Sequence, residues 1–291
     1  MISGSYIYTR RRIINVVAML LSGIATFIGL LFLTWILWVT MKSGVSALSP
    51  RLFTKITAYG SEGGLSNAIV GSIGMDMLAL LICAPIGVLA GTYLAEYASR
   101  SKLGSTVRFL NDILLSAPSI VLGLLVYVIV VRPMSNLTNG GVSFSGLAGA
   151  IALALIGLPV IVRTTDEMLR LVPSTLREAA LSLGIPQWKL TVQVLIRAAT
   201  SGILTGILLA LARLAGETAP LLFTAFGNNF MTLNPLNKMA SVPQVMYQYT
   251  GDPAPEKHAI AWAGALLITA FVLALSLLSH FFFSRKKVSY E

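Results

Sequence analysis

Charged residues are scarce in this sequence. Asp, Glu, Lys and Arg make up only 11% of the 291 residues, whereas 56% are hydrophobic, and the mean hydropathy is +0.81. An ordinary soluble domain carries about 25% charged residues. The composition therefore excludes an ordinary soluble protein, and we predict a membrane protein.

Several other features are missing. Cys83 is the only cysteine, so a disulfide within the chain is excluded. The sequence has no Gly-x-x-x-x-Gly-Lys-Ser/Thr loop, and no glycine directly precedes a lysine, so it lacks the usual loop that holds the phosphates of ATP. His258 and His280 lie at opposite ends of one apolar block with no set of ligands near them, so no metal site is indicated.

Six long apolar blocks dominate the chain. A bilayer core of about 30 Å needs roughly 20 helical residues, and each block is long enough to cross it. The first block is too long for a signal peptide and no small-residue cleavage site follows it, so we expect a retained helix. The predicted fold class is all-α, a polytopic membrane protein with about six transmembrane helices. The blocks lie at residues 13–39, 67–94, 113–131, 144–162, 198–225 and 259–283.

Lys and Arg are unevenly distributed between the segments that flank the blocks. Fourteen Lys and Arg residues lie in four segments: before the first block, between the second and third, between the fourth and fifth, and after the sixth. Only six lie in the other three segments between blocks. Cytoplasmic loops carry an excess of Lys and Arg, so both termini are predicted to be cytoplasmic. We interpret the net charge of +10 as a topology signal that also complements the membrane surface, and expect no nucleic-acid binding.

The loop at 163–197 contains the pattern of a short soluble helix, "PSTLREAALSLGIPQWK". Ser174 can cap the start of the helix, Gly184 stands where a left-handed C-terminal residue belongs, and Pro186 can open a second helix. The sequence therefore predicts a helix between two membrane spans.

One face of this helix is mildly apolar, because Leu176, Ala179, Ala180 and Leu183 follow the i, i+3, i+4, i+7 spacing. Two interpretations are open. The helix lies flat on the lipid headgroups, or it docks into a groove of a cytoplasmic partner. In the second case the two alanines allow close approach, and Glu178 offers a specific polar contact.

The stretch "EAALSLG" at 178–184 is similar to the EAA loop of importer-type ABC permeases. That pattern has Glu-Ala-Ala, three residues, Gly, nine residues and then Ile-x-Leu-Pro. Glu178, Ala179, Ala180 and Gly184 stand at the pattern positions, whereas Arg197 stands where the family usually has proline. Without that proline, we expect the helix to run unbroken into the fifth span.

Further stretches resemble the PstA-type permeases of bacterial phosphate ABC importers, in the same order. The resemblance covers most of residues 67–228, the predicted permease core with its EAA loop at 163–197. The ends, 1–66 and 229–291, match only in having one span each. The matching stretches are "PIGVLAGTYLAEY" (85–97), "NDILLSAPSIVLGLLVY" (111–127), "LPVIVRTTDEMLRLVPSTLREAALSLG" (158–184) and "RLAGETAPLLFTAFGN" (213–228).

The resemblance implies the type I ABC importer permease fold and alternating access in the bacterial inner membrane. This chain would be a non-enzymatic half of the pore with no cofactor of its own. Its partners would be a PstC-like second permease, a homodimeric PstB-like cytoplasmic ATPase that uses ATP and Mg²⁺, and an external PstS-like phosphate-binding protein. The ATPase would contact Arg177, Glu178, Ala179, Ala180 and Gly184.

Two rival functions are open. A permease for another oxyanion, such as phosphonate or molybdate, keeps the EAA loop and changes only the cargo. A self-sufficient channel or secondary carrier needs no ATPase, and the soluble helix in the loop at 163–197 argues against it.

Two opposite charges, Arg213 and Glu217, lie inside the fifth apolar block. A charge at the middle of a bilayer costs roughly 2.5–3.5 kcal/mol, so it indicates a function and a partner. The i, i+4 spacing places the two side chains on one helix face, where they can pair. Gly216 and Pro220 favour a broken helix here, and Thr218 adds a hydroxyl group.

Three interpretations of this pair are open. Arg213 lines the anion path, where its guanidinium group matches phosphate oxygens, and Glu217 weakens its hold. Alternatively, the pair is a structural salt bridge at a gate or subunit interface, or it lies near the outer surface. Asp76 in the second span is expected to belong to the transport pathway or gate with Arg213, Glu217 and Thr218. It could pair with Arg213, carry a proton or face a wet cavity, and we favour the role of arginine partner over direct contact with phosphate. Asp112 is expected to cap the third span.

Overall fold

The computed structural model describes residues 3–99, 101–138 and 143–284. Arg100, Arg285, Lys286 and Lys287, which entered the charge count, lie outside these ranges. Within the ranges, six helices are long and apolar enough to cross a membrane, and each overlaps one predicted block. The all-α prediction is therefore confirmed for this part of the chain. The spans are Tyr8–Ala47, Ser66–Glu96, Ser119–Leu137, Gly146–Arg170, Gln187–Leu214 and Pro255–His280.

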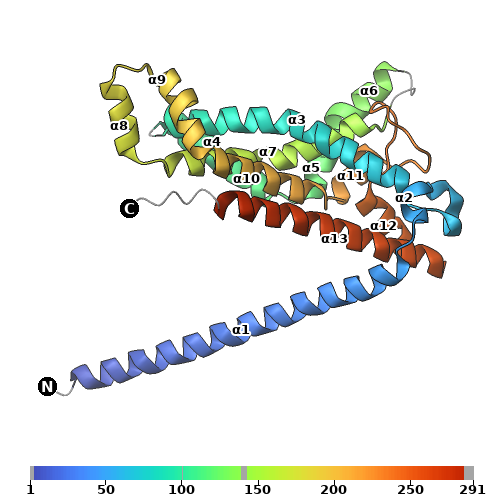
Figure 1. The fold of residues 1–291 in the computed structure, drawn as a ribbon, viewed down its shortest axis with the longest axis horizontal. Coiled ribbons are helices and arrows are strands. Elements are labelled where there is room, and N and C mark those ends of the chain that lie inside the picture. Colours follow the sequence, from blue (N-terminus) through green and yellow to red (C-terminus); the bar gives the residue numbers. More distant parts are fainter. Residues whose placement is uncertain (1–2, 100, 139–142, 285–291) are drawn as a thin grey trace.

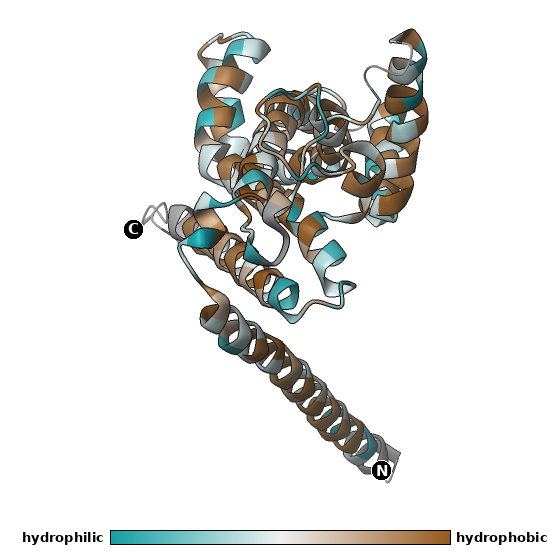
Figure 2. Cartoon of the chain, turned by 90° about the vertical axis from the view of Figure 1, so that its right-hand side faces the viewer, coloured by the Kyte–Doolittle hydropathy of each residue, from teal (hydrophilic) through white to brown (hydrophobic). Residues whose placement is uncertain are grey.

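The first helix, α1 (Ser3–Ala47), projects away from the rest of the chain (Figure 1). Its 45 residues span roughly 68 Å at 1.5 Å per residue. It meets α13 (Pro255–Ser284) near its own C-terminal end, where Gly44 lies against Trp262 and Leu266. Its surface is apolar on most sides (Figure 2). A helix of this kind suits contact with lipid or with another membrane subunit.

Short elements connect α1 to the second span. These are α2 (Arg51–Thr54) and the 3-10 helix η1 (Thr57–Glu62), after which α3 runs from Ser66 to Glu96. The Asn67 side chain fixes this connection, because its Oδ1 accepts a hydrogen bond from the Thr57 N–H (3.0 Å) and its Nδ2 donates to the Asn228 carbonyl (2.7 Å). We call this end of the bundle the α12 end, after α12 (Val242–Thr250), which packs here against α3 and α13.

The segment at 102–116 differs from the prediction. We expected the third span to start at 113, but residues 113–116 belong to a separate helix, α4 (Lys102–Ser116). Ala117 has extended backbone angles (φ −65°, ψ 136°), as expected for a residue that precedes a proline. Asp112 therefore lies inside α4, and its predicted capping role is wrong. The third span itself comprises α5 (Ser119–Val126), the π-helical turn η2 (Tyr127–Val131) and α6 (Arg132–Leu137).

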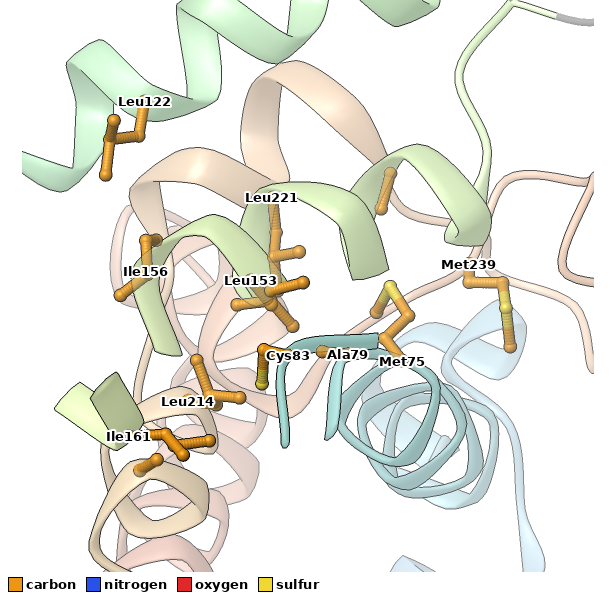
Figure 3. Close-up of a cluster of buried hydrophobic side chains, with 13 residues drawn as sticks. Met75, Ala79, Cys83, Leu122, Leu153, Ile156, Ile161, Leu214, Leu221 and Met239 are labelled. Carbon is orange, nitrogen blue, oxygen red and sulfur yellow. The ribbon is translucent and has the colours of Figure 1, made fainter. Parts of the chain in front are cut away.

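The core lies where α3 packs along α7 (Gly146–Arg170), the most extensive helix pair in the described structure. Small residues allow this close approach, as is typical of membrane helices. A Cβ atom added at Gly91 would come within 2.6 Å of the Val162 carbonyl oxygen, so only glycine fits there. Figure 3 shows the buried cluster at the centre, in which Cys83, Leu153 and Leu214 meet.

Beyond α7 the chain forms α8 (Ser174–Ser182), which stands outside the bundle (Figure 1). We call this end of the bundle the α8 end. Next, α9 (Gln187–Lys189), the π-helical turn η3 (Leu190–Leu195) and α10 (Ile196–Leu214) follow one another without a break. The prediction that the helix runs unbroken past Arg197 is therefore confirmed. After α10 comes the short helix α11 (Ala219–Thr224).

Candidate functional site

The local sequence explains the bounds of α8. Gly184 has φ +76°, the left-handed conformation that was predicted to follow the helix. Pro186 precedes α9 as its N-cap, so it opens the second helix as expected. The predicted cap is wrong, because Ser174 is the first helical residue and Pro173 occupies the cap position without a side-chain hydrogen bond.

The two faces of α8 differ in exposure. Ala180 is 7% exposed and joins a buried cluster with Leu190 and Leu195 of the following helix. Glu178 and Ala179 are exposed, and so is Gly184. The predicted apolar face is therefore only partly used within this chain. Ala180 packs α8 against the rest of the chain, and Glu178 and Ala179 form an exposed edge of α8.

Arg177 points back toward the bundle instead of outward. Its Nη2 lies 2.8 Å from the Glu96 Oε1 at the end of α3, and it also donates to the Leu169 carbonyl (2.6 Å). Its Nη1 donates to the Val172 carbonyl (2.8 Å). The Leu169 carbonyl lies in the last turn of α7, where it also accepts a hydrogen bond from the Val172 N–H (3.3 Å), and the Val172 carbonyl lies just beyond that turn. One guanidinium group thus joins α8 to the ends of both α3 and α7.

A second ionic cluster lies at the same end of the bundle. Asp166 of α7 accepts hydrogen bonds from Arg108 of α4 (2.7 Å) and from Arg170 of α7 (2.9 Å). Arg108 also donates to the Leu94 carbonyl of α3 (2.5 Å). The Asp166 side chain is only 10% exposed, so this carboxylate is a buried junction between α4 and α7.

Sequence reasoning did not select Glu96 or Asp166 as site residues. Both are acidic residues at the end of a predicted span, beside a segment rich in Lys and Arg. That position is a usable signal, because a carboxylate there has basic neighbours from several loops. The signal does not name the distant partner, which lies 58 positions away for Asp166 and 81 for Glu96, although the second partner of Asp166, Arg170, is only four positions away.

The structure pairs Arg213 and Glu217 across a helix break. Arg213 belongs to the last turn of α10, and Glu217 lies between α10 and α11. Their ionic groups are 3.9 Å apart, beyond ordinary hydrogen-bond length, so the pair is loose. The Arg213 side chain is 39% exposed and that of Glu217 is 15% exposed. The guanidinium group therefore keeps most of its donors available to a ligand.

The break itself follows from the residues predicted to favour it. Pro220 occupies the first turn of α11, where the missing N–H of proline costs nothing. Thr218 is the N-cap residue of α11, and its side chain makes no capping hydrogen bond. The backbone at 215–218 is irregular, although the N–H groups of residues 215, 216 and 217 still donate to carbonyls of the last turn of α10. Membrane proteins tolerate irregular backbone where a cavity or another protein covers it.

Asp76 does not pair with Arg213. It is 6% exposed within α3, and no hydrogen bond or ion pair is recorded for it among the residues that the structure describes. Its surroundings are apolar, because it lines a cavity with Leu211, Ala215 and other hydrophobic residues. The role of arginine partner, which we favoured for Asp76, is therefore wrong in this structure.

Metal ligands do not gather in the described part of the chain, where no group of three or more His, Cys, Asp or Glu residues lies close enough to hold an ion. At the α12 end, His258 Nε2 lies 2.6 Å from the Asp252 carbonyl, and Lys257 pairs with the Asp252 carboxylate at 2.5 Å. The hydrogen bond from Lys257, with a second from the Ala254 N–H, lowers the pKa of Asp252. These contacts fix the turn before α13.

Comparison with known proteins gives a consistent result. The family described as "Binding-protein-dependent transport system inner membrane component" matches residues 84–288. The phosphate transport system permease protein PstA of Xylella fastidiosa (strain 9a5c) is 53% identical over 290 residues, which cover 99% of both chains. The PstA of Pasteurella multocida (strain Pm70) is 50% identical, over 95% of this chain and 96% of its own.

A more distant relative and a solved structure extend the comparison. The probable phosphate permease PstA of Methanocaldococcus jannaschii is 37% identical, over 92% of both chains. An inward-facing structure of the MetNI methionine ABC transporter matches with a TM-score of 0.57 at 19% identity, over 75% of this chain and 95% of that one. At this identity the structural match indicates the fold alone.

Proposed function

This chain belongs to the family of binding-protein-dependent transport system inner membrane components, and we infer that it is the permease subunit of an ATP-driven phosphate importer. The observation that carries the proposal is the similarity to phosphate permeases over 99% of the chain, which includes every span and the α8 segment. The type I ABC importer fold agrees with it.

Family membership implies a second permease, an ATPase and a solute-binding protein as partners. In our proposal these are a PstC-like permease, a homodimeric PstB-like ATPase that consumes ATP with Mg²⁺, and a PstS-like phosphate-binding protein. The chain itself performs no catalysis and holds no cofactor. It forms half of the translocation path in the bacterial inner membrane.

The α8 end is placed in the cytoplasm, together with both termini. The charge bias of the sequence supports this orientation. The start of α1 and the end of α13 point toward the α8 end, as six spans require (Figure 1). Phosphate would enter at the α12 end and leave beside α8.

The exposed edge of α8 is proposed to sit in a groove of the ATPase. Glu178 offers a carboxylate to that groove, and Ala179 allows close approach of its wall. Arg177 acts as a positioning residue, because it transmits movement of α8 to α3 and α7 through the contacts described above. Without the contacts of Arg177, α8 would be attached mainly through Ala180 and could move without moving α3 and α7.

The pair at the α10 break is proposed to lie on the phosphate path. Arg213 presents a guanidinium group whose geometry matches a phosphate anion. The Glu217 carboxylate lies 3.9 Å from the Arg213 guanidinium group. This loose contact keeps Arg213 oriented and lowers the affinity of Arg213 for the anion. Conduction requires this balance, because an ion bound too tightly is not released. Thr218 adds a hydroxyl group at the same break.

The test is phosphate uptake into vesicles that contain all the subunits, with ATP supplied on the ATPase side. We expect uptake to require ATP, and phosphate to outcompete phosphonate and molybdate. Vesicles without the ATPase serve as the control, and uptake there would indicate a channel or carrier. If molybdate or phosphonate outcompetes phosphate, the cargo is that oxyanion and the phosphate assignment is wrong.

A further inference from the structure

A cavity of about 310 Å³ lies between α3, α10 and α13, apart from the Arg213–Glu217 pair. Its volume is at the lower end of the range for small-molecule sites, roughly 300–1,000 Å³. Ile73 of α3 is 55% exposed and Phe271 of α13 is 44% exposed, so these two lining residues also reach the outer surface of the bundle. The cavity can therefore be entered from between the spans.

Nearly all of the lining is hydrophobic, with two polar exceptions. Ser72 is already engaged, because its Oγ accepts a hydrogen bond from the Val242 N–H (2.9 Å). Asp76 is not engaged. It is 6% exposed, and the described residues supply no hydrogen bond or ion pair to its carboxyl group. A buried ionisable group without a partner is costly, so native proteins rarely retain one without a use.

The residues that line the cavity determine which class of ligand can bind there. An anion would be repelled by a carboxylate and would find no cationic group in the lining. A divalent cation such as Ca²⁺ needs six to eight oxygen ligands, and one carboxyl group cannot supply them. A lipid acyl chain would fill the apolar space but would leave Asp76 unpartnered. A molecule with an apolar body and one ammonium group satisfies both parts of the site.

We propose that this cavity is a binding site for a small lipophilic amine, with Asp76 as the counter-ion of the ammonium group. The ammonium group donates charge-assisted hydrogen bonds to the carboxylate. The apolar body packs against Ile73 and Phe271. A ligand of this kind partitions into the bilayer and reaches the cavity from the surface of the bundle.

The site also touches the α10 break. Leu211 and Ala215 line the cavity and flank Arg213 on either side along the chain. An occupant of the cavity therefore contacts the last turn of α10 without contacting the path proposed for phosphate. The binding inference itself does not depend on the proposed function, because it can be measured without transport.

The experiment uses the full chain in lipid nanodiscs and an octylamine that carries a photoreactive diazirine at the end of its alkyl chain. We expect saturable labelling of peptides from α3 and α13, with competition by octylamine but not by octanol, which has the same length and no charge. Asp76→Asn removes the charge while it keeps the size, and we expect it to weaken binding by roughly tenfold or more.

Two further variants complete the design. Ile73→Trp places a larger side chain at the mouth and is expected to reduce labelling while Asp76 stays intact. Asp112→Asn removes a carboxylate that is 61% exposed on α4, and it should label like the unaltered chain. Unchanged labelling of Asp76→Asn, equal competition by octanol, or labelling confined to other helices would each overturn the proposal. None of these results depends on whether the chain transports phosphate.

Discussion

Arg177 and Glu96 form an ion pair, with 2.8 Å between the guanidinium Nη2 and the carboxylate Oε1, although they stand 81 positions apart in the sequence. The pair joins α8 to the end of α3, and the same guanidinium group holds the end of α7 through Leu169 and Val172. An element that projects from the bundle is therefore attached to its two most extensively packed helices.

This attachment gives a first prediction. Arg177→Gln removes the ion pair and weakens two carbonyl contacts, whereas Glu96→Gln removes only the charge of the acceptor. Hydrogen bonds to charged groups contribute about 1.5–3 kcal/mol each. Arg177→Gln weakens more of the contacts that attach α8 to the bundle, so we expect it to lose more ATP-driven phosphate uptake than Glu96→Gln. Uptake and ATP hydrolysis are to be measured in the assembled transporter. Similar small losses in both variants would show that Arg177 does not position α8.

The outward edge of α8 gives a second prediction. Glu178→Lys reverses a charge on an exposed residue, so we expect the spans to fold and assemble normally while uptake is abolished. Glu256→Lys, an exposed reversal in the first turn of α13, is the matched control and should leave uptake nearly unchanged. Normal uptake by Glu178→Lys would contradict the proposed contact with the ATPase.

A third prediction concerns the α10 break. Arg213→Gln keeps a polar side chain of similar length but removes the charge that attracts phosphate. We expect phosphate uptake to fall at least tenfold, the equivalent of about 1.4 kcal/mol, while the amount of assembled transporter in the membrane changes little. Assembly is measured by co-purification of the other subunits. Equal losses of uptake and assembly would indicate a structural salt bridge instead.

The junction at Asp166 gives a fourth prediction, on stability. Asp166→Asn removes the charge that faces Arg108 and Arg170, and the buried position of the carboxylate makes this loss costly, about 2 kcal/mol. Thermal unfolding in detergent should report a lower midpoint. Asp112→Asn breaks a 3.5 Å pair between side chains that are 55% and 61% exposed, and should cost less than about 0.5 kcal/mol. A larger effect for Asp112→Asn would refute this ranking.

The turn before α13 gives a fifth prediction, on pH. The hydrogen bond from Lys257 lowers the pKa of Asp252 in the folded protein below the value of about 3.9 for an unfolded chain. The stabilisation from Asp252 is therefore complete above that value and is lost as the pH falls through the folded-state pKa. Asp252→Asn should lower the unfolding midpoint near pH 6, and the difference from the unaltered chain should shrink near pH 3. A difference that does not depend on pH would argue against an ionic contribution.

The sequence predicted the elements well where a local property decides them. All six spans follow from hydropathy, because only a helix can satisfy its backbone within a lipid core. The interruption after Leu214 follows from Gly216 and Pro220, and the end of α8 follows from Gly184. The start of the third span was missed although Pro118 marks the boundary, because the apolar residues 113–115 at the end of α4 continue the hydrophobic run of α5.

The partners of charged residues were not predictable in the same way. Arg213 and Glu217 were identified as a pair because they are four residues apart in the sequence, although Glu217 lies just beyond the end of α10. The contact of Arg108 with Asp166 and that of Arg177 with Glu96 depend on how α3, α4 and α7 pack. Asp76 was assigned the wrong partner for this reason, since its depth along α3 gave no information on which helix it faces.

The π-helical turn η3 determines how α9 is rotated relative to α10. Residues 190–195 accommodate about one more residue per turn than an α-helix does, so α9, which joins this turn directly, is rotated relative to α10. Loss of a single amino acid in this turn would restore the ordinary winding and swing α9 by roughly 100° about the axis of α10. The rotation of α9 about the axis of α10 thus depends on the length of this six-residue turn, whereas α8 is held against α3 and α7 by the contacts of Arg177.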